Sequence, residues 1–296
     1  MNLPFQRKNR PGILDAVVLM IVLAAVGLFL HRMVRVIQYQ WEWGAIPSYF
    51  FRFDARTGVL RPNMLTQGFI TTVKLSVWSM VMAFAIGSLC GVMRSRGGRF
   101  QRFVGWLYVN TVRNIPSLVL VFIFYFFISS QLFDTLDLDA RLRESPALLR
   151  DLMEWLFTAE ERINMFFSAV ITLALYEGAY VTEIIRGGLS GIPREQWDAA
   201  YSLGLTPVQT FLRVIFPQTL RRVFSPLGGQ FISTIKDSAI VSVISVQELT
   251  FQGMELMSAT YLTFEIWITI TLLYFGLTFS LSRFMAFLER RYVRFP

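Results

Sequence analysis

Residues 195–204 read EQWDAAYSLG, a polar stretch that lies between strongly apolar parts of the chain. Pro193 suits the beginning of a helix, where its missing N–H would have no partner, and Gly204 suits the left-handed backbone just beyond a helix end. Thr206 and Gln209 then form the pattern of a capping box, which indicates that a second helix begins at once. We therefore expect two short helices joined at a glycine, on the face of a membrane protein.

The composition of the chain is typical of a membrane protein. Of its 296 residues, 54% are hydrophobic and 16% are charged, whereas roughly a quarter of the residues in soluble domains are charged. Six apolar stretches approach the length of about 20 residues that crosses a bilayer as a helix. We predict an all-α integral membrane protein with about six transmembrane helices, at Ile13–Leu30, Phe69–Met93, Ile115–Phe133, Phe166–Ile185, Phe224–Val246 and Leu262–Ser282.

The positions of arginine and lysine predict the orientation of the chain in the membrane. Four basic clusters fall on one side of a six-span arrangement, which places both termini in the cytoplasm. The acid-rich loop at residues 134–162 lies opposite, whereas the loop at residues 31–63 disagrees because it carries five arginines. We attribute the net charge of +8 to topology and anionic lipid rather than to nucleic acid. The four clusters are Arg7, Lys8 and Arg10; Arg94, Arg96, Arg99 and Arg102; Arg194, Arg213, Arg221 and Arg222; and Arg283, Arg290, Arg291 and Arg294.

Three segments are expected along the chain. Residues 1–63 hold an N-terminal transmembrane helix and an external loop, residues 64–289 hold a core of five spans, and residues 290–296 form a cytoplasmic tail. Within the second span, residues 87–91 read GSLCG, a small-residue pattern suited to close helix packing. Cys90 is the single cysteine of the chain, which excludes an intramolecular disulfide and a cysteine-rich metal site.

The polar stretch resembles the E-A-A-x3-G-x9-I-x-L-P signature of membrane subunits in bacterial ABC importers. It stands here as Asp198-Ala199-Ala200, Gly204, Val214 and Phe216-Pro217, with the spacing intact and three conservative departures. The resemblance covers about residues 64–289 and implies a type I ABC importer core, in which residues near 193–217 form the coupling helix. Further segments resemble the polar amino acid branch of that family: Arg113-Asn114-Ile115-Pro116, Gly178-Ala179-Tyr180, Glu183-Ile184-Ile185-Arg186-Gly187-Gly188, Pro217-Gln218 and Lys236-Asp237-Ser238.

The resemblance implies a non-catalytic permease subunit of an ATP-driven amino acid importer in the bacterial inner (cytoplasmic) membrane. A second permease, identical or related, two ATPases and a periplasmic or extracellular substrate-binding protein would complete it. The chain contains no G-x-x-x-x-G-K-[ST] loop, so ATP and magnesium are expected on the partner ATPase, and neither a cofactor nor a metal is expected here. Trp197 and Tyr201, four residues apart, are expected to anchor the contact with the ATPase. The residues expected to couple the two subunits are Trp197, Asp198, Ala199, Ala200, Gly204 and Pro217.

Ionisable side chains inside the predicted spans are candidates for the transport path, because a charge at the bilayer centre costs several kcal/mol. Glu177 and Lys236 fall at similar depths, about 13 and 18 Å from the inner edge at 1.5 Å per residue. They could neutralise each other, face the ammonium and carboxylate of a substrate, or form a purely structural pair. With Tyr180 and Asp237, they are the residues that we assign to the substrate path.

An ion-coupled secondary transporter that uses membrane carboxylates is the alternative function. Such a protein usually shows repeated halves and more spans. A membrane enzyme would need a catalytic constellation, whereas the single histidine, His31, has no paired motif around it. The sequence leaves open which solute moves, because Glu177 and Glu195 depart from the family pattern. It also leaves open the roles of the N-terminal helix and of the acidic loop at residues 134–162.

Overall fold

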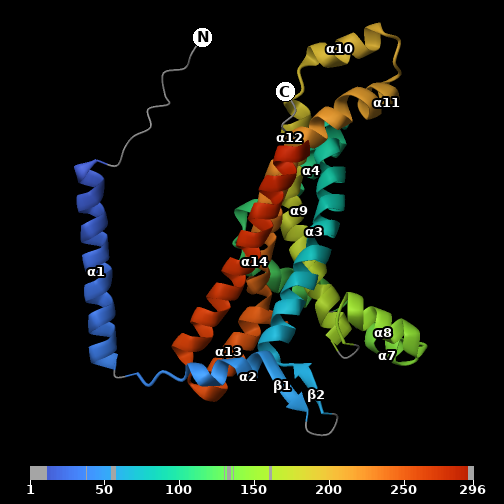
Figure 1. Cartoon of the computed structure of the whole chain (residues 1–296). Helices are drawn as coiled ribbons and strands as arrows, with labels where there is room; N and C mark the ends of the chain where they lie inside the picture. Colours follow the sequence, from blue (N-terminus) through green and yellow to red (C-terminus); the bar gives the residue numbers. More distant parts are fainter. Residues whose placement is uncertain are drawn as a thin grey trace. The chain divides into compact units, whose positions relative to one another are not determined.

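The computed structural model describes residues 12–37, 39–54, 58–129, 131, 135, 137–159 and 162–292, and these residues form helices apart from one short hairpin (Figure 1). The chain divides into two compact units, Met1–Trp43 and Gly44–Pro296. Four of the basic residues from which the orientation was predicted, Arg7, Lys8, Arg10 and Arg294, lie outside the described residues.

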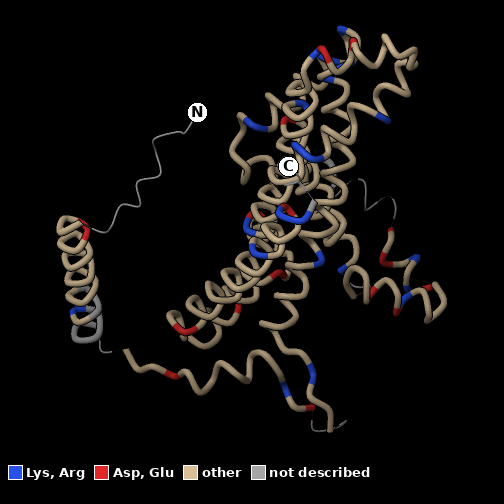
Figure 2. Tube along the Cα trace, turned by 45° about the horizontal axis from the view of Figure 1, so that its top comes forward, with Lys and Arg blue, Asp and Glu red and all other residues tan. Residues whose placement is uncertain are grey.

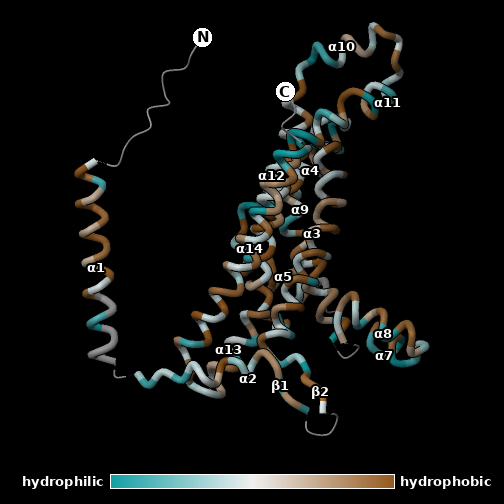
Figure 3. The backbone as a smooth tube through the Cα atoms, in the orientation of Figure 1, coloured by the Kyte–Doolittle hydropathy of each residue, from teal (hydrophilic) through white to brown (hydrophobic). Residues whose placement is uncertain are grey.

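The first unit contains a single α-helix, α1 (Ile13–Ile37). Its described apolar segment, Ile13–Leu28, is shorter than the roughly 20 residues that cross a bilayer. The side chains of residues 12–28 are exposed, and Figure 3 shows that most of this helix is hydrophobic. The predicted first span is therefore helical and apolar, and its crossing of the membrane stays a prediction.

Three described helices of the second unit are long and apolar enough to cross a membrane: α3 (Met64–Arg96), α9 (Ile163–Ser190) and α14 (Thr263–Tyr292). A fourth crossing is possible if α4 (Arg99–Asn114) and α5 (Ser117–Ile123), which are bent by 114° relative to each other, form one broken span. These helices correspond to the predicted second, third, fourth and sixth spans. The described helices thus give three or four crossings by length and composition, and the number six stays a prediction.

The described helix of the predicted third span begins two residues later than expected, and Phe133, the expected end, lies outside the described residues. The sequence pattern began this span at Ile115, whereas α5 begins at Ser117 and continues as a π-helix, η2 (Phe124–Ser129). Pro116 explains the break, since a proline cannot continue the hydrogen bonds of α4 and disfavours helical backbone at the residue before it. Ile115 accordingly has extended backbone, with φ −99° and ψ 137°.

Helices α3 and α9 approach each other closely along the small-residue pattern at residues 87–91. A Cβ atom on Gly87 would lie 2.5 Å from Cγ1 of Val181, and one on Gly91 would lie 2.8 Å from Cβ of Ile185. Since no side chain fits at these distances, the glycines permit the contact. The predicted packing face is confirmed.

The predicted fifth span is divided between two kinds of helix. Helix α12 (Phe216–Asp237) continues as a 3-10 helix, η5 (Ser238–Ile244), and ends at Ser245, whose φ is +64°. Helix α13 (Leu249–Thr260) follows and leads into α14. The buried carboxylate of Glu248 caps α13, because it accepts hydrogen bonds from the backbone N–H groups of Thr250 and Phe251 at 2.9 and 2.8 Å.

The compact unit that holds the spans begins before residue 64. Buried Ile46, in α2 (Ile46–Phe50), packs in one cluster with Leu65 and Leu249. Two short strands, β1 (Phe51–Asp54) and β2 (Val59–Pro62), then pair in antiparallel register. Residues 44–50, which were expected to belong to the N-terminal segment, therefore belong to the same compact unit as the spans and pack with its core.

The two ends of the bundle carry different elements. Helices α10 (Arg194–Ser202) and α11 (Pro207–Thr210) project from one end, and the hairpin lies at the other end (Figure 1). Helices α7 (Leu138–Arg143) and α8 (Ala147–Leu156) extend sideways near the beginning of α9. Figure 2 shows many lysines and arginines on the half of the bundle that carries α10 and α11, as expected for the cytoplasmic side of a membrane protein.

Candidate functional site

The elbow, residues 193–217, connects α9 with α12 at one end of the bundle (Figure 1). Its first helix is α10 (Arg194–Ser202), and its second begins with α11 (Pro207–Thr210). Between them, Gly204 has a φ of +77°, which a residue with a side chain adopts only at a cost. The predicted pair of helices hinged at a glycine is confirmed.

The second helix of the elbow begins with the expected capping box. The Oγ1 atom of Thr206 accepts a hydrogen bond from the N–H of Gln209 at 3.4 Å, and Oε1 of Gln209 accepts from the N–H of Thr206 at 3.0 Å. The helix does not stop near Pro217. It passes through a π-helix, η4 (Phe211–Ile215), and Pro217 lies in the first turn of α12, where a missing N–H is tolerated.

The inner face of α10 binds the elbow to the transmembrane helices. Trp197 is only 8% exposed and packs in one cluster with Ile192 and Ile215. The guanidinium carbon of Arg96, at the end of α3, lies 3.3 Å from the centre of the Trp197 ring, a cation–π contact. The expectation that Trp197 anchors a partner protein is therefore corrected, because its ring faces the protein's own core. Ala200 is buried on the same face.

The outer face of the elbow is exposed and partly apolar. Asp198 and Ala199 are exposed on α10, and Tyr201 is 45% exposed. Three leucine and valine side chains that the sequence analysis did not single out extend this surface across the hinge: Leu203, Val208 and Leu212. Exposed apolar side chains within a polar, charged segment indicate a contact surface, and that combination is the signal by which they could have been found. We call the six residues Asp198, Ala199, Tyr201, Leu203, Val208 and Leu212 the outer surface of the elbow.

Further contacts fix the base of the elbow to the helices on either side. Arg222 on α12 donates a hydrogen bond to the carbonyl oxygen of Gly191, where α9 ends. Gln218 donates to Oε1 of Gln196 on α10 at 3.3 Å. Where α9 meets α12, a Cβ atom on Gly188 would lie 2.2 Å from Cγ1 of Val223. The elbow therefore has direct mechanical connections to α9 and α12.

Charged side chains also join α3 to α9 on the elbow side of the bundle. The carboxylate of Glu183 pairs with Arg94 of α3 through one oxygen and with Arg186 through the other, at 2.8 Å. All three side chains are partly exposed, so solvent screens these pairs and each stabilises the fold modestly. They join the two helices ten residues before the elbow begins at Pro193.

A polar cluster lies within the transmembrane region around Glu177 of α9, which is completely buried. Its Oε2 atom accepts a hydrogen bond from Nε2 of Gln230 on α12 at 2.5 Å, whereas its Oε1 atom has no hydrogen-bond partner among the described residues. Asp237 and Thr234, also on α12, are neighbours of the Glu177 carboxyl group. We call Tyr176, Glu177, Tyr180, Gln230, Thr234 and Asp237 the polar cluster.

Lys236 lies outside the polar cluster, so the expected pairing of Glu177 with Lys236 is corrected. Gln230, Thr234 and Asp237 recur at the spacing of one helical face, and Lys236 is rotated from Asp237 by about 100°. Its side chain is exposed. Lys236 and Glu177 lie at similar depths in the membrane, but the side chain of Lys236 does not point toward Glu177. Their roles in the substrate path stay a prediction.

Arg113 lies next to the two tyrosines of the polar cluster. The hydroxyl oxygens of Tyr176 and Tyr180 lie 3.2 Å apart, one turn from each other on α9. The guanidinium carbon of Arg113, at the end of α4, lies 5.1 Å from the centre of the Tyr180 ring. Arg113 was not assigned to the substrate path, although an arginine beside an apolar span is itself a signal.

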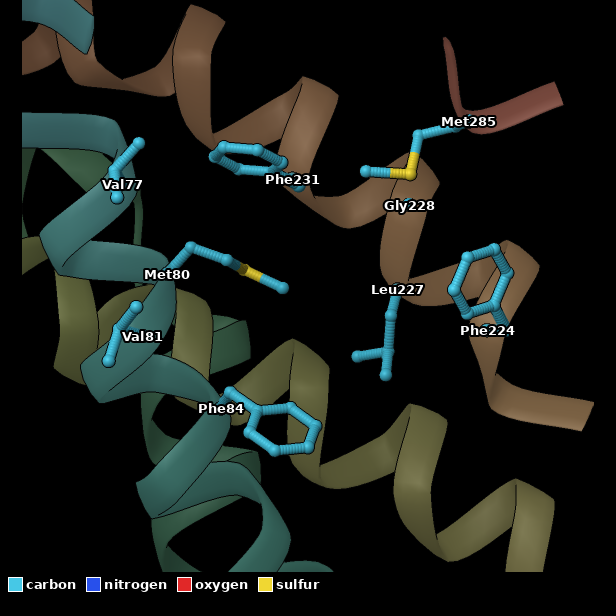
Figure 4. Close-up of a pocket in the computed structure, with 9 residues that line it drawn as sticks. All are labelled: Val77, Met80, Val81, Phe84, Phe224, Leu227, Gly228, Phe231 and Met285. Carbon is cyan, nitrogen blue, oxygen red and sulfur yellow. The ribbon is translucent and has the colours of Figure 1, made fainter. Parts of the chain in front are cut away.

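The pocket in Figure 4 differs from the polar cluster in its chemistry. It has a volume of about 450 Å³ between α3 and α12 and is lined by apolar side chains, among them Met80, Phe84, Leu227, Phe231 and Met285. A polar solute would find no hydrogen-bonding side chain there. Among the residues that the structure describes, no group of three or more His, Cys, Asp or Glu side chains could hold a metal ion.

Known proteins resemble this chain over most of its length. A family model described as the binding-protein-dependent transport system inner membrane component matches residues 83–294, which include the elbow and the polar cluster. The glutamine transport system permease protein of Escherichia coli (strain K12) is 32% identical over 256 residues, which cover 86% of this chain and 98% of the relative. The glutamate/aspartate import permease protein of the same strain is 29% identical over 258 residues, covering 86% and 96%.

Two solved structures share the helical arrangement. A chain from the crystal structure of an amino acid ABC transporter with histidines is 30% identical, with a TM-score of 0.61 over 77% of this chain and 94% of that chain. A chain from the inward-facing methionine ABC transporter is 17% identical, with a TM-score of 0.52 over 75% and 95%. At that identity, the second likeness concerns the fold alone.

Proposed function

The chain belongs to the family of binding-protein-dependent transport system inner membrane components, and from this membership we propose that it is the permease subunit of an ATP-driven amino acid uptake transporter. The expected all-α fold of a type I ABC importer is confirmed by the two solved structures. The chain is a multi-pass membrane protein, and we place it in the bacterial inner membrane. The observation that carries the proposal is the elbow, a hinged pair of helices with an exposed apolar outer surface.

The remaining work of the transporter is assigned to partner subunits. ATP and magnesium would bind to two ATPases, since the sequence contains no phosphate-binding loop. A second permease, identical or related, would complete the transmembrane path, and an external substrate-binding protein would deliver the solute. The family description, which includes dependence on a binding protein, supports the last of these partners.

The contacts of the elbow suggest how movement of the ATPases reaches the membrane. The outer surface of the elbow would dock into a groove of the ATPase, with Leu203 and Val208 on either side of Gly204. The inner face transmits the displacement, because Trp197 packs against the core and stacks with Arg96 of α3. ATP binding can favour one arrangement of the spans over another only if it changes their free energies by different amounts. A rigid connection between the ATPase and the spans is therefore required at the elbow.

The polar cluster supports an amino acid as the solute. Glu177 and Asp237 provide acidic groups that suit an ammonium group, and Arg113 provides a cation that suits a carboxylate. Tyr180 lies beside Arg113, Tyr176 directly precedes Glu177 on α9, and the two tyrosines supply hydroxyl groups 3.2 Å apart. We therefore propose that the zwitterionic part of the solute passes between these groups, and that the permease excludes solutes lacking either charge.

The test uses the complete transporter, purified with its ATPase and binding protein in lipid nanodiscs. Gly204 is replaced by valine, whose branched side chain opposes the left-handed backbone at that position. Gly187→Val is the matched control, because a Cβ atom at Gly187 meets nothing within 4 Å and its backbone is helical. Hydrolysis of ATP is measured with and without the binding protein and an amino acid.

We expect the wild type and the Gly187→Val control to hydrolyse ATP faster when the binding protein and amino acid are present. The Gly204→Val variant is expected to lose this stimulation. The proposal is overturned in favour of a secondary transporter if no ATPase associates with the chain and an ion gradient drives solute uptake by the chain alone in proteoliposomes.

A further inference from the structure

Helix α8 (Ala147–Leu156) is strongly amphipathic, although it belongs to a loop that stands out in the sequence for its acidic residues. At about 100° per residue, its apolar side chains cover roughly 160° of the helix circumference. Arg150, Asp151 and Glu154 occupy the opposite arc. None of the ten residues of the helix is buried.

One part of the apolar arc faces the protein. Leu149 and Met153 line a small cavity together with Leu142, Ile163 and Phe167, which belong to α7 and α9. These contacts hold α8 beside the beginning of α9. They leave the rest of the apolar arc without cover from the described residues of the chain.

The uncovered part consists of Leu148, Leu152 and Trp155, which recur at the spacing of a single helical stripe. Leu148 is 80% exposed, Leu152 is 46% exposed and Trp155 is 73% exposed. Figure 1 shows α7 and α8 extending sideways from the bundle rather than along it. The stripe therefore needs an apolar environment outside the chain, to the side of the transmembrane helices.

Two hydrogen bonds fix the depth of α8 relative to the membrane. Nζ of Lys74 donates to the carbonyl oxygen of Glu154 at 2.8 Å, and Nε1 of Trp78 donates to that of Leu156 at 3.0 Å. These carbonyls belong to the last turn of α8, where no partner exists within the helix. Both donors lie on α3, so the end of α8 is held at the level of Lys74 and Trp78.

The spacing of charges along α3 places Lys74 at a depth that fits the edge of the hydrocarbon layer remote from the elbow. It precedes Arg94 by twenty residues on α3, or about 30 Å of helix, which equals the thickness of the hydrocarbon core. Arg94 is paired with Glu183 on the elbow side, as suits a residue at the other edge. Tryptophan side chains are enriched at such edges, and Trp78 and Trp155 fit this pattern.

We propose that α8 is an interfacial helix that lies in the leaflet remote from the elbow, with Leu148, Leu152 and Trp155 inserted among the lipids. Its charged arc faces water, and Lys74 and Trp78 connect its end to α3. The lipid surface is favoured over a docked protein because the hydrogen bonds hold the stripe level with the edge of the hydrocarbon layer.

The experiment places a spin label at single cysteines in the full transporter in nanodiscs of phosphatidylethanolamine and phosphatidylglycerol. Cys90 is first replaced by serine, since it is the single native cysteine. Labels at Leu148, Leu152 and Trp155 test the stripe, and a label at Asp151 is the matched water-facing control. Collisions of each label with oxygen, which enters lipid, are compared with collisions with a water-soluble nickel chelate.

We expect the three stripe positions to collide mainly with oxygen and the Asp151 position mainly with the chelate. If the stripe positions meet the chelate as often as Asp151 does, the proposal is overturned. It is also overturned if they are accessible to the chelate until the substrate-binding protein is added, since that result assigns the stripe to protein docking. The distinction holds whether or not the elbow binds an ATPase, because it requires only that α3 spans the membrane.

A second measurement avoids labels on α8. The difference in fluorescence between the wild type and Trp155→Phe isolates the emission of Trp155. Brominated phospholipid should quench this emission, and aqueous iodide should quench it weakly. The reverse pattern would place Trp155 in water and contradict the proposal.

Discussion

The elbow and the polar cluster are both polar regions of an apolar protein, but they are determined by different kinds of interaction. The elbow takes its shape from neighbouring residues, namely a cap at Thr206 and a left-handed glycine at Gly204. The polar cluster exists only because α9 and α12 turn Glu177 and Gln230 toward each other. Local shape can thus be read along the chain, whereas contacts between helices depend on how each helix is rotated.

Trp197→Ala is the change that should most strongly disturb the elbow, and it tests a contact between the elbow and α3 that is not local. Removing a buried aromatic side chain of this size typically costs about 3–5 kcal/mol. We expect α10 to separate from α3, with faster proteolysis at Arg194 and Arg213 and loss of transport-coupled ATP hydrolysis. Tyr201→Ala, on the exposed side of the same helix, is the control for proteolysis, which it should leave unchanged. Unchanged proteolysis in Trp197→Ala would show that the packing of Trp197 does not hold the elbow.

Glu177→Leu tests the polar cluster, which is formed by contacts between helices. The change leaves Nε2 of Gln230 buried without its acceptor, which costs about 1–3 kcal/mol. We expect a lower melting temperature of the purified transporter and no solute uptake into proteoliposomes. Glu177→Gln keeps an acceptor for Gln230, so it should melt near the wild-type temperature and yet transport poorly. Full uptake by the Gln variant would show that the charge of Glu177 is not needed.

Thr206→Ala removes a purely local interaction, the cap of α11. The loss of such a cap costs about 1 kcal/mol. Amide hydrogen exchange at residues 207–210 should therefore become faster, while exchange near Glu177 stays the same. Thr206→Ser keeps the hydroxyl group and should exchange at the wild-type rate. An equal effect on both regions would indicate that elbow and cluster unfold together.

Leu203→Ser should have the smallest effect on folding, since the side chain is 81% exposed. Exposed substitutions of this kind change the free energy of unfolding by about 0.5 kcal/mol or less. Binding to the ATPase is expected to weaken, because Leu203 belongs to the outer surface of the elbow. Leu148→Ser, at the other end of the bundle, is a control that should leave ATPase binding unchanged. Equal weakening by both changes would contradict the assignment of the surface.

The sequence predicts local features of this protein well. Gly204 and the capping box of Thr206 and Gln209 carry their own structural requirements, so the two helices of the elbow are where they were expected. The close contact at Gly87 and Gly91 was also predictable, because two small residues four positions apart lie on the same face of a helix.

The features that the sequence did not predict depend on rotation about a helix axis. Lys236 was matched to Glu177 by depth, although the position before Asp237 points away from α9. Trp197 was assigned to an outside partner, whereas its ring packs on the core and on Arg96. The stripe of α8 was overlooked because acidic residues dominate the composition of that loop, while the spacing of Leu148, Leu152 and Trp155 carries the signal.

Because Gly87 and Gly91 fit closely against α9, we expect α3 and α9 to move as one rigid unit during transport. Two helices in contact at their backbones cannot slide without a clash, so the rearrangement must occur along another boundary. The apolar pocket of Figure 4 follows such a boundary, between α3 and α12. Apart from the weak hydrogen bond that Met80 accepts from Thr234, the methionine and phenylalanine side chains there are held by packing, so we expect them to exchange neighbours as the two helices move.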